Sequence, residues 1–345
     1  MRFDLSSKKD KNSAKRKSEK EKVEERREEI LARGRKFKYP LQYAKHKMIV
    51  YTVVIAFFAI IGLVVAGWAA LYKFQDMGDI MYRISTVVPI SVAKIDGKSV
   101  RFSDYLLYAR SSLTPLERSS GVEDTVQDKT AMINDYKRMA LTQAEDLTYA
   151  LKLAQENGIE INNDEVKATF DSHRKVGGAE RSEESFLKVL STNLGVSKKE
   201  YERMLYLALI KAKVVQEIDI NAVKVSEQVE RLLSENGGDF AKVKETLGDS
   251  VQYENTGGLV DSKNVDGGRA AKAESQNVGQ ISARFLSTNG DGYYFVKTTE
   301  KKEGKVAYES LYVKFTEFDD RLKDIREEGK VKEYINLPEQ SQNNS

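Results

Sequence analysis

The chain has 345 residues, no cysteine, two histidines and a formal net charge of +3 at pH 7. The lack of cysteine excludes disulfides, thiolate metal sites and a thiol nucleophile. With only His46 and His173, a histidine-rich zinc site is excluded as well, and we interpret His173 as a surface residue near a helix end. No P-loop, Rossmann glycine fingerprint or nucleophile elbow occurs, so we expect neither a metal nor a cofactor.

The first 47 residues are strongly basic. They hold 17 Lys or Arg and 8 Asp or Glu, a net charge of +9, whereas residues 48–345 carry −6. A segment so poor in apolar residues cannot bury enough surface to offset its ordering entropy. We therefore expect a solvated, partly disordered tail with some helix around residues 19–33. Its last basic residues favour anionic lipid headgroups, and the interspersed glutamates argue against nucleic-acid binding.

Residues 48–72 contain no charged side chain. A helix of this length reaches about 37 Å, which is enough to cross a hydrocarbon core of about 30 Å with some tilt. The run is longer than the apolar region of a cleaved signal peptide, about 7–15 residues, so a retained anchor is favoured. The positive-inside rule places residues 1–47 in the cytoplasm and the C-terminal domains outside. Small residues at 62, 66 and 70 are too common by chance to decide the oligomeric state.

The next part of the chain reads as helical after a short hairpin. Residues 73–90 are predicted to be a linker, and Asp96-Gly97 predicts a turn between two strands. A helix should then start at Asp104, capped by Ser103, and stop before Pro115. Further helices are predicted over 126–157, 164–175 and 182–192, the second ended by Gly177-Gly178. A capping box, Ser197 to Glu200, opens another long helix.

The character of the sequence changes around Asp219. A helix at 226–236 precedes a segment dense in Gly and Asn, with strand-like runs at 293–298 and 307–315. We predict a compact α+β unit over residues 221–315, a last helix over 316–336 and a disordered tail over 337–345.

Several motifs in the helical part occur in the order found in one chaperone family. They are VAKIDGK at 92–98, FSDY at 102–105, GIEI at 158–161, NDEV at 163–166, SFL at 185–187 and LGVS at 194–197. Over about 130 residues the chain therefore resembles the SurA, PrsA and PpiD chaperones. The resemblance implies a mainly helical SurA N-terminal-like domain at 91–220 that binds unfolded exported polypeptides.

The following unit resembles a parvulin-type prolyl isomerase domain. The motifs are DFA at 239–241, GGL at 257–259, VGQIS at 278–282 and GYYFVK at 292–297. Two family histidines lack a match: Tyr294 replaces one, and no strand precedes the helix at 226–236 to carry the other. We hypothesise that residues 307–315 supply the missing strand, as in a permuted sheet. The absence of both histidines favours weak or absent catalysis. Isomerisation needs no obligatory nucleophile to lower its barrier of about 20 kcal/mol, so an active isomerase stays an alternative.

The resemblance also implies site residues. Asp249 and Tyr294 are weak catalytic candidates, and the substrate-binding candidates are Phe240, Leu259, Phe285 and Tyr294. The fold class expected for the whole chain is one transmembrane helix, a mainly α-helical SurA N-terminal-like domain and an α+β parvulin-like domain.

The function expected is that of a membrane-anchored extracytoplasmic folding factor whose partners are unfolded polypeptides and the lipid bilayer. An active prolyl isomerase and a non-catalytic cell-envelope scaffold are the alternatives. Catalysis of cis/trans exchange in a proline peptide distinguishes the first, and a lack of affinity for unfolded chains distinguishes the second.

Overall fold

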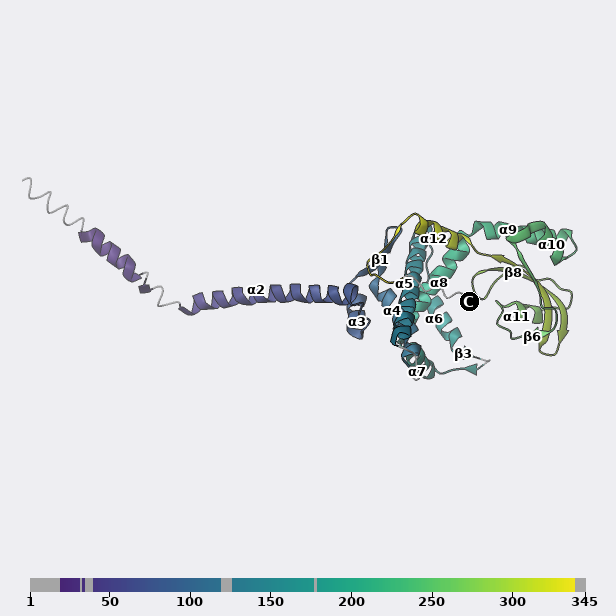
Figure 1. Cartoon of the computed structure of the whole chain (residues 1–345), viewed down its shortest axis with the longest axis horizontal. Coiled ribbons are helices and arrows are strands. Elements are labelled where there is room, and N and C mark those ends of the chain that lie inside the picture. The colour runs from purple at the N-terminus through teal and green to yellow at the C-terminus, as the bar shows by residue number, and fades with distance from the viewer. Residues whose placement is uncertain (1–18, 32, 35–39, 119–125, 177–178, 339–345) are drawn as a thin grey trace, which may run out of the picture. The chain divides into compact units, whose positions relative to one another are not determined.

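The computed structural model describes residues 19–31, 33–34, 40–118, 126–176 and 179–338, and the chain divides into two compact units, Met1–Ala69 and Ala70–Ser345 (Figure 1). The first unit is helical wherever it is described. Residues 19–31 form one helix, and α2 spans Pro40–Trp68. Residues 1–18, which make up much of the predicted tail, lie outside the described residues.

The predicted apolar span is helical throughout. α2 continues into a π-helical turn, η1, at Ala69–Lys73. Lys47–Lys73 is the one helix in the described part of the chain that is long and apolar enough to cross a membrane. Its most apolar window has a mean hydropathy of 2.9, and none of that window is buried. The structure thus contains one long, unburied apolar helix, which is a candidate anchor.

The second unit begins with a helical region. Its helices are α3 (Asp79–Val87), α4 (Phe102–Arg118), α5 (Val126–Asn157), α6 (Asn163–His173), α7 (Glu183–Asn193) and α8 (Lys198–Ile218). The turn at Asp96 and Gly97, with φ of 42° and 84°, joins β1 (Ser91–Ile95) to β2 (Lys98–Arg101) in the predicted hairpin. Ser197 and Glu200 form the predicted capping box.

Three local predictions in this region need correction. Residues 73–90 are not only a linker, because they contain α3, whose Met81 and Tyr82 pack against the core. α4 begins at Phe102 and continues through Pro115; the proline removes one hydrogen bond to the carbonyl four residues earlier, and the helix ends three residues later at Arg118. α6 ends at His173, and a short hairpin follows it, with strands β3 (Lys175–Val176) and β4 (Ala179–Glu180). The predicted stop at 177–178 lies outside the described residues.

An α+β region follows. It contains α9 (Ile220–Glu235), α10 (Phe240–Leu247), η2 (Gly248–Ser250), β5 (Gln252–Asn255), β6 (Val260–Asp261), α11 (Arg269–Glu274), β7 (Phe285–Leu286), β8 (Gly292–Lys302) and β9 (Lys305–Lys314). The sheet is antiparallel with the order β5-β9-β8-β7, and β6 also pairs with β9. Residues Tyr308–Lys314 lie inside the sheet, so the hypothesis that 307–315 joins it meets its structural condition.

The two faces of this sheet have separate cores, because side chains alternate along each strand. Tyr293 and Phe295 of β8 pack with residues of α9 and α10. Val296 instead packs with Ala270 and Ala273 of α11. Figure 1 shows α9 and α10 apart from α11 beside the strands.

The C-terminal segment returns to the helical region. α12 (Glu317–Glu327) stops where Gly329 adopts φ of 67°, and β10 (Val331–Glu333) pairs antiparallel with β1. The predicted single helix over 316–336 is therefore wrong. The predicted tail is wrong at its start, since Leu337 is 5% exposed and belongs to the core of the helical region together with Phe318 and Ile335. Residues 339–345 of that tail lie outside the described residues.

One buried carboxylate joins the point where the chain leaves the helical region to the point where it returns. Asp219 is 2% exposed and caps α9 by accepting a hydrogen bond from Ala222 N at 2.8 Å. Its other oxygen accepts from Thr316 N at 2.7 Å and from Glu317 N at 3.1 Å, at the start of α12. Residues 220–315 are therefore an insertion whose two ends meet at Asp219.

Candidate functional site

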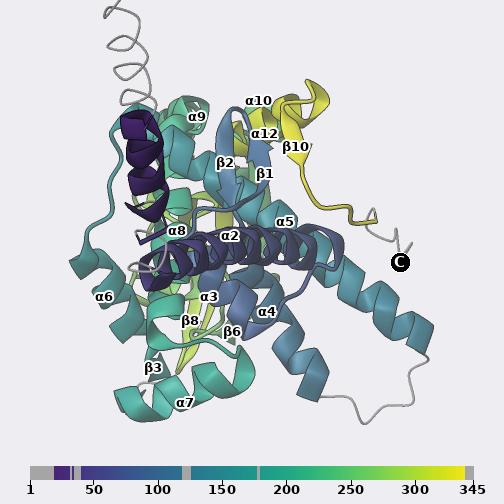
Figure 2. The ribbon, with the colours of Figure 1, turned by 90° about the vertical axis from the view of Figure 1, so that its left-hand side faces the viewer.

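A hollow of about 840 Å³ lies in the helical region between α6, α7, α8 and the β3–β4 hairpin. α6 and α7 both contact α8, and Figure 2 shows them with β3 on one side of this region. We call this hollow the helical groove. Ten of its fourteen lining residues are charged: Lys167, Asp171, Arg174, Lys175, Glu180, Glu183, Lys198, Lys199, Glu202 and Arg203; the others are Asn163, Val166, Phe170 and Tyr206.

Aromatic packing lies beneath the helical groove, and Phe170 is the ring of this packing that lines the groove. The Phe170 ring meets Phe186 edge to face at 5.4 Å and Tyr201 at 6.2 Å, which fixes α6 and α7 on α8. Val166 and Phe170 are mostly buried, and Lys198 Nζ lies 5.1 Å from the Phe170 ring centroid. His173, exposed as predicted, shares a 2.8 Å hydrogen bond with the Tyr201 hydroxyl.

The charged walls of the helical groove pair with one another. Arg174 contacts Asp171 and Glu180 at 3.0 Å each, and Lys198 contacts Glu183 at 2.6 Å. The hydrogen bond from Lys198 lowers the pKa of Glu183 and raises the pKa of Lys198. Exposed pairs of this kind add little to stability, so a bound chain can exchange them at little cost.

A second, smaller hollow of about 360 Å³ adjoins the groove and shares Lys199 and Arg203 with it. It lies between α3, α4 and α8 and is also lined by Tyr82 and Leu107. Arg203 donates to both oxygens of the buried Asp104, at 3.2 and 2.8 Å. This two-pronged contact orients the guanidinium between the two hollows.

The α+β region carries a cluster of aromatic side chains on the α11 face of its sheet. Tyr294 of β8 lies opposite Tyr312 of β9, and their rings stack at 4.6 Å. Phe285 of β7 pairs with Tyr294 on the other side, with ring centroids 6.0 Å apart. Cross-strand pairing therefore brings together residues that lie up to 27 positions apart in the chain.

Arg269, the first residue of α11, covers this cluster. Its guanidinium lies 5.0 Å from the Tyr294 ring centroid and 5.9 Å from that of Tyr308. Arg269 Nε donates to the Asp266 carbonyl at 2.8 Å, and Nη1 forms an ion pair with Glu254. The Tyr308 hydroxyl donates to the Asp266 carboxylate at 2.5 Å. We call Tyr294, Tyr308, Tyr312, Phe285 and Arg269 the aromatic cluster.

The side chains of the aromatic cluster are largely buried, and its hydroxyl groups are not reactive. Gly267 has φ of 76°, and a Cβ there would lie 2.8 Å from the Tyr294 ring, so only glycine allows this loop to cover the ring. Burial raises the pKa of the Tyr294 hydroxyl despite the opposing charge of Arg269. Burial also raises the pKa of Tyr308, as does its bond to Asp266. These phenols stay protonated at neutral pH and supply neither a base nor a nucleophile.

The structure brings together two of the residues predicted as a site and separates the others. Tyr294 and Phe285 are neighbours in the aromatic cluster. Phe240 is 1% exposed in the core on the opposite face of the sheet. Leu259 is partly exposed just before β6. The Asp249 side chain is fully exposed in η2 and contacts Lys244 at 3.6 Å.

Sequence reasoning missed Arg269, Tyr308 and Tyr312. Tyr308, Ser310 and Tyr312 are spaced two apart in a predicted strand, so their shared face could have been recognised from period-two alternation. Arg269 offered no comparable signal, because its place follows from the path of the 266–268 loop.

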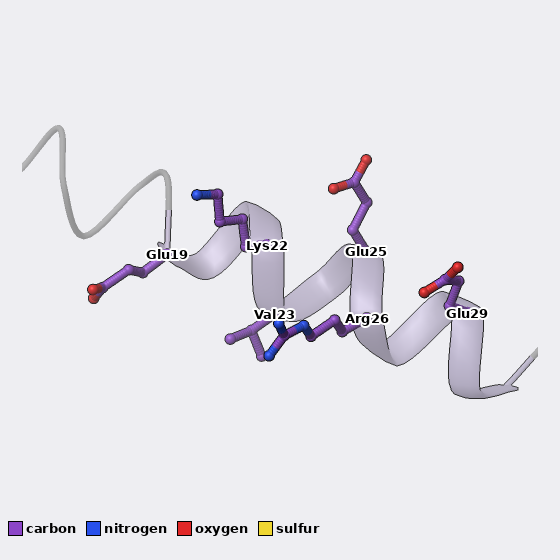
Figure 3. A pocket seen from close by; sticks show the side chains of 6 residues that line it. All are labelled: Glu19, Lys22, Val23, Glu25, Arg26 and Glu29. Atoms are coloured by element: carbon purple, nitrogen blue, oxygen red, sulfur yellow. The ribbon is translucent and has the colours of Figure 1, made fainter.

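Other features do not qualify as sites. The hollow lined by Glu19, Lys22, Val23, Glu25, Arg26 and Glu29 belongs to one isolated helix (Figure 3), and its labelled side chains point in different directions. Among the residues that the structure describes, no group of three or more His, Asp or Glu side chains could hold a metal ion.

Comparison with known families places the helical groove in a recognised domain. The family model described as the SurA-like N-terminal domain matches residues 41–215, which is 175 of the 345 residues. The match therefore runs from α2 to near the end of α8, and it stops before the α+β region. No curated protein matches the sequence.

Proposed function

This chain belongs to the family of the SurA-like N-terminal domain, and on that premise we propose that it is a membrane-anchored, extracytoplasmic folding factor that binds unfolded polypeptides. The domain itself indicates a chaperone-like folding factor with unfolded polypeptides as partners. The anchor, the extracytoplasmic side and the place of binding are the further parts of the proposal.

The observation that carries the proposal is the helical groove inside the matched region. An unfolded chain presents apolar and aromatic side chains together with free peptide groups and charges of either sign. The groove is lined by Val166, Phe170 and Tyr206 and has walls of both signs held by weak, exchangeable ion pairs. Such a surface accommodates many sequences because it depends on no single contact.

Membrane attachment and orientation rest on the Lys47–Lys73 helix and on the charge asymmetry across it. The helix is apolar on all sides and its most apolar window is unburied, as a span in lipid must be. The net charge of +9 before it and −6 after it favours a cytoplasmic N-terminus.

We propose that the α+β region serves as a parvulin-like accessory with little or no isomerase activity. Two observations support this. The face that carries Tyr294 is filled by Arg269 and covered by the Gly267 loop, which leaves little room for a proline ring. Its tyrosines are protonated, and of the other predicted residues only Phe285 lies beside them, while Phe240, Leu259 and Asp249 lie elsewhere.

The test uses the absence of cysteine in the native chain. A photo-crosslinker on Lys199→Cys, which lines the helical groove, should capture an unfolded client added to the full chain in nanodiscs. Lys323→Cys, exposed on α12, is the matched control and should capture little. Equal capture from both positions would contradict binding in the groove.

The same preparation tests catalysis separately. Cis/trans exchange in a proline peptide, followed by NMR, should stay at the spontaneous rate. Exchange above that rate that is lost in Tyr294→Ala would restore the isomerase interpretation. If the chain shows no capture of the client and no exchange above the spontaneous rate, the scaffold alternative is favoured.

A further inference from the structure

Exposed apolar side chains of the second unit concentrate in one short segment. Of the eleven large hydrophobic residues exposed in the described part of residues 70–345, five lie between positions 74 and 88: Phe74, Ile80, Ile84, Val87 and Val88. Val87 is 83% exposed and Ile80 is 71% exposed. Apolar residues that are exposed singly are ordinary, but a contiguous group marks an interaction surface.

These residues form a distinct face of α3. Ile80, Ile84 and Val87 are spaced four and three apart, so they lie on one stripe of the helix. Met81, Tyr82 and Ser85 lie on a second face, packed against the core of the unit. Asp79, Arg83 and Thr86 form a third, polar face. The helix therefore has an apolar face that the fold itself does not use.

The position of α3 in the chain indicates what can cover its apolar face. Asp79 follows Lys73, the end of the apolar span, by six residues, which reach at most about 21 Å even when extended. The end of the span is also fastened to the same unit. Leu71 is 2% exposed in the core that α3 packs on, and the Tyr72 hydroxyl donates to the Ser91 carbonyl at 2.7 Å.

Cationic side chains border the apolar face. Lys73 lies beside Phe74, with its Nζ 5.8 Å from the ring centroid. Arg83 lies on the polar face of α3, and Arg101 Nη2 donates to the Thr86 carbonyl at 3.3 Å. An apolar face with basic residues along its edge is the pattern of a helix that lies in the plane of a membrane interface.

We infer that α3 lies on the outer surface of the membrane, with Ile80, Ile84 and Val87 in the boundary between headgroups and acyl chains. Together with the span it makes a two-point attachment that holds the helical region close to the bilayer and restricts its rotation. This inference rests on the proposed membrane anchor.

The experiment places a fluorophore on single cysteines in the full chain, reconstituted in vesicles of phosphatidylcholine and phosphatidylglycerol. Lipids with a nitroxide near the headgroup quench a probe that lies in the interface. Val87→Cys tests the apolar face, and Thr86→Cys tests the adjacent polar face. Val265→Cys, 94% exposed on the α+β region, is the apolar control. Leu63→Cys on α2 reports insertion of the span.

Quenching at Val87 about twofold or more above that at Val265 and Thr86, with Leu63 quenched by lipids labelled deeper in the acyl chain, is the expected result. Quenching at Leu63 with Val87 equal to Val265 overturns the inference and leaves the anchor intact. No quenching at Leu63 overturns the anchor and the inference together. A Val87 probe that is shielded from aqueous iodide but untouched by lipid quenchers means that protein covers the face, which also overturns the inference.

Discussion

At the scale of single residues, two buried carboxylates connect parts of the molecule that are far apart in the chain. Asp219 binds the starts of α9 and α12, and Glu145 of α5 reaches Arg326 of α12 at 3.0 Å. Both therefore act between the helical region and the segment that returns after residue 315. Because a buried charge is costly unless it is fully partnered, these two positions should dominate the effects of single polar substitutions.

Asp219→Ala should lower the free energy of unfolding by about 3 kcal/mol, since three backbone N–H groups at two helix starts lose their acceptor. Asp239→Ala is the matched control, because Asp239 caps only α10 and is partly exposed, so its loss should have a clearly smaller effect. Denaturation of the full chain in detergent, followed by circular dichroism, measures both. Equal losses would mean that Asp219 is an ordinary cap.

Glu145 should make stability fall as pH rises. Burial raises its pKa to about 7 against the opposing charge of Arg326, and its Oε1 has no hydrogen-bond partner within the described residues. The folded state therefore holds a proton that the unfolded state has lost above about pH 4.5. The contribution is full below that pH and is lost as pH rises through about 7, with a total near 3 kcal/mol.

Glu145→Gln should flatten that slope between about pH 4.5 and about pH 7, the pKa values of the unfolded and folded states. Glu327→Gln, on the exposed side of α12, should leave it unchanged. Unfolding free energies of the three chains at several pH values provide the measurement. A slope that persists in Glu145→Gln would assign the pH dependence to other groups.

At the scale of elements, the most consequential contact is the pairing of β10 with β1. Ala93 faces Glu333, and Ile95 faces Val331. Tyr334 N donates to the Val92 carbonyl at 2.9 Å. This pairing carries Ile335 and Leu337 into the core, and Arg138 Nη1 contacts Glu333 at 2.5 Å beside it. β10 thus adds a third strand to the β1–β2 hairpin at the start of the helical region, which makes a three-stranded sheet.

Leu337→Ala should destabilise the chain by about 3 kcal/mol, as a large-to-small change in a core does. Tyr334→Ala, three residues earlier and 41% exposed, should have a clearly smaller effect. Thermal unfolding of the full chain in detergent compares them. An unchanged melting temperature in Leu337→Ala would mean that the Leu337 side chain does not stabilise the core.

At the scale of the whole molecule, the chain of the second unit leaves the helical region after α8 and comes back at α12. The helical region is therefore discontinuous in sequence, and the α+β region is inserted into it. Both ends of the insertion meet at Asp219, with Thr316 N 2.7 Å from its carboxylate. Insertions of this kind are tolerated because their ends lie close together.

Replacing residues 221–315 with a short Gly-Ser linker should leave a folded helical region, because a few residues suffice to join two points that already touch. The shortened chain should keep helical circular dichroism and should still capture unfolded clients from Lys199→Cys. Loss of folding would show that the core on α9 and α10 is needed by the helical region. Loss of capture with folding intact would place the binding of clients in the α+β region.

The sequence alone determined what depends on neighbours along the chain. Length and hydropathy predicted the apolar helix, period and capping predicted α5, α7 and α8, and Asp96-Gly97 predicted the first hairpin. The motifs of the helical part predicted the SurA-like region that the family match supports. These features are local because a helix or a turn is stabilised by residues within a few positions of one another.

Only the tertiary structure decided what depends on residues far apart. The pairing of β10 with β1 joins positions about 240 residues apart, and a strand of three residues carries too little pattern to predict it. The aromatic cluster forms because Phe285, Tyr294 and Tyr312 meet across strands, and Phe240 is excluded because it packs on the other face. Burial follows from the whole fold, so the sequence could name aromatic candidates but could not tell a closed core position from a binding surface.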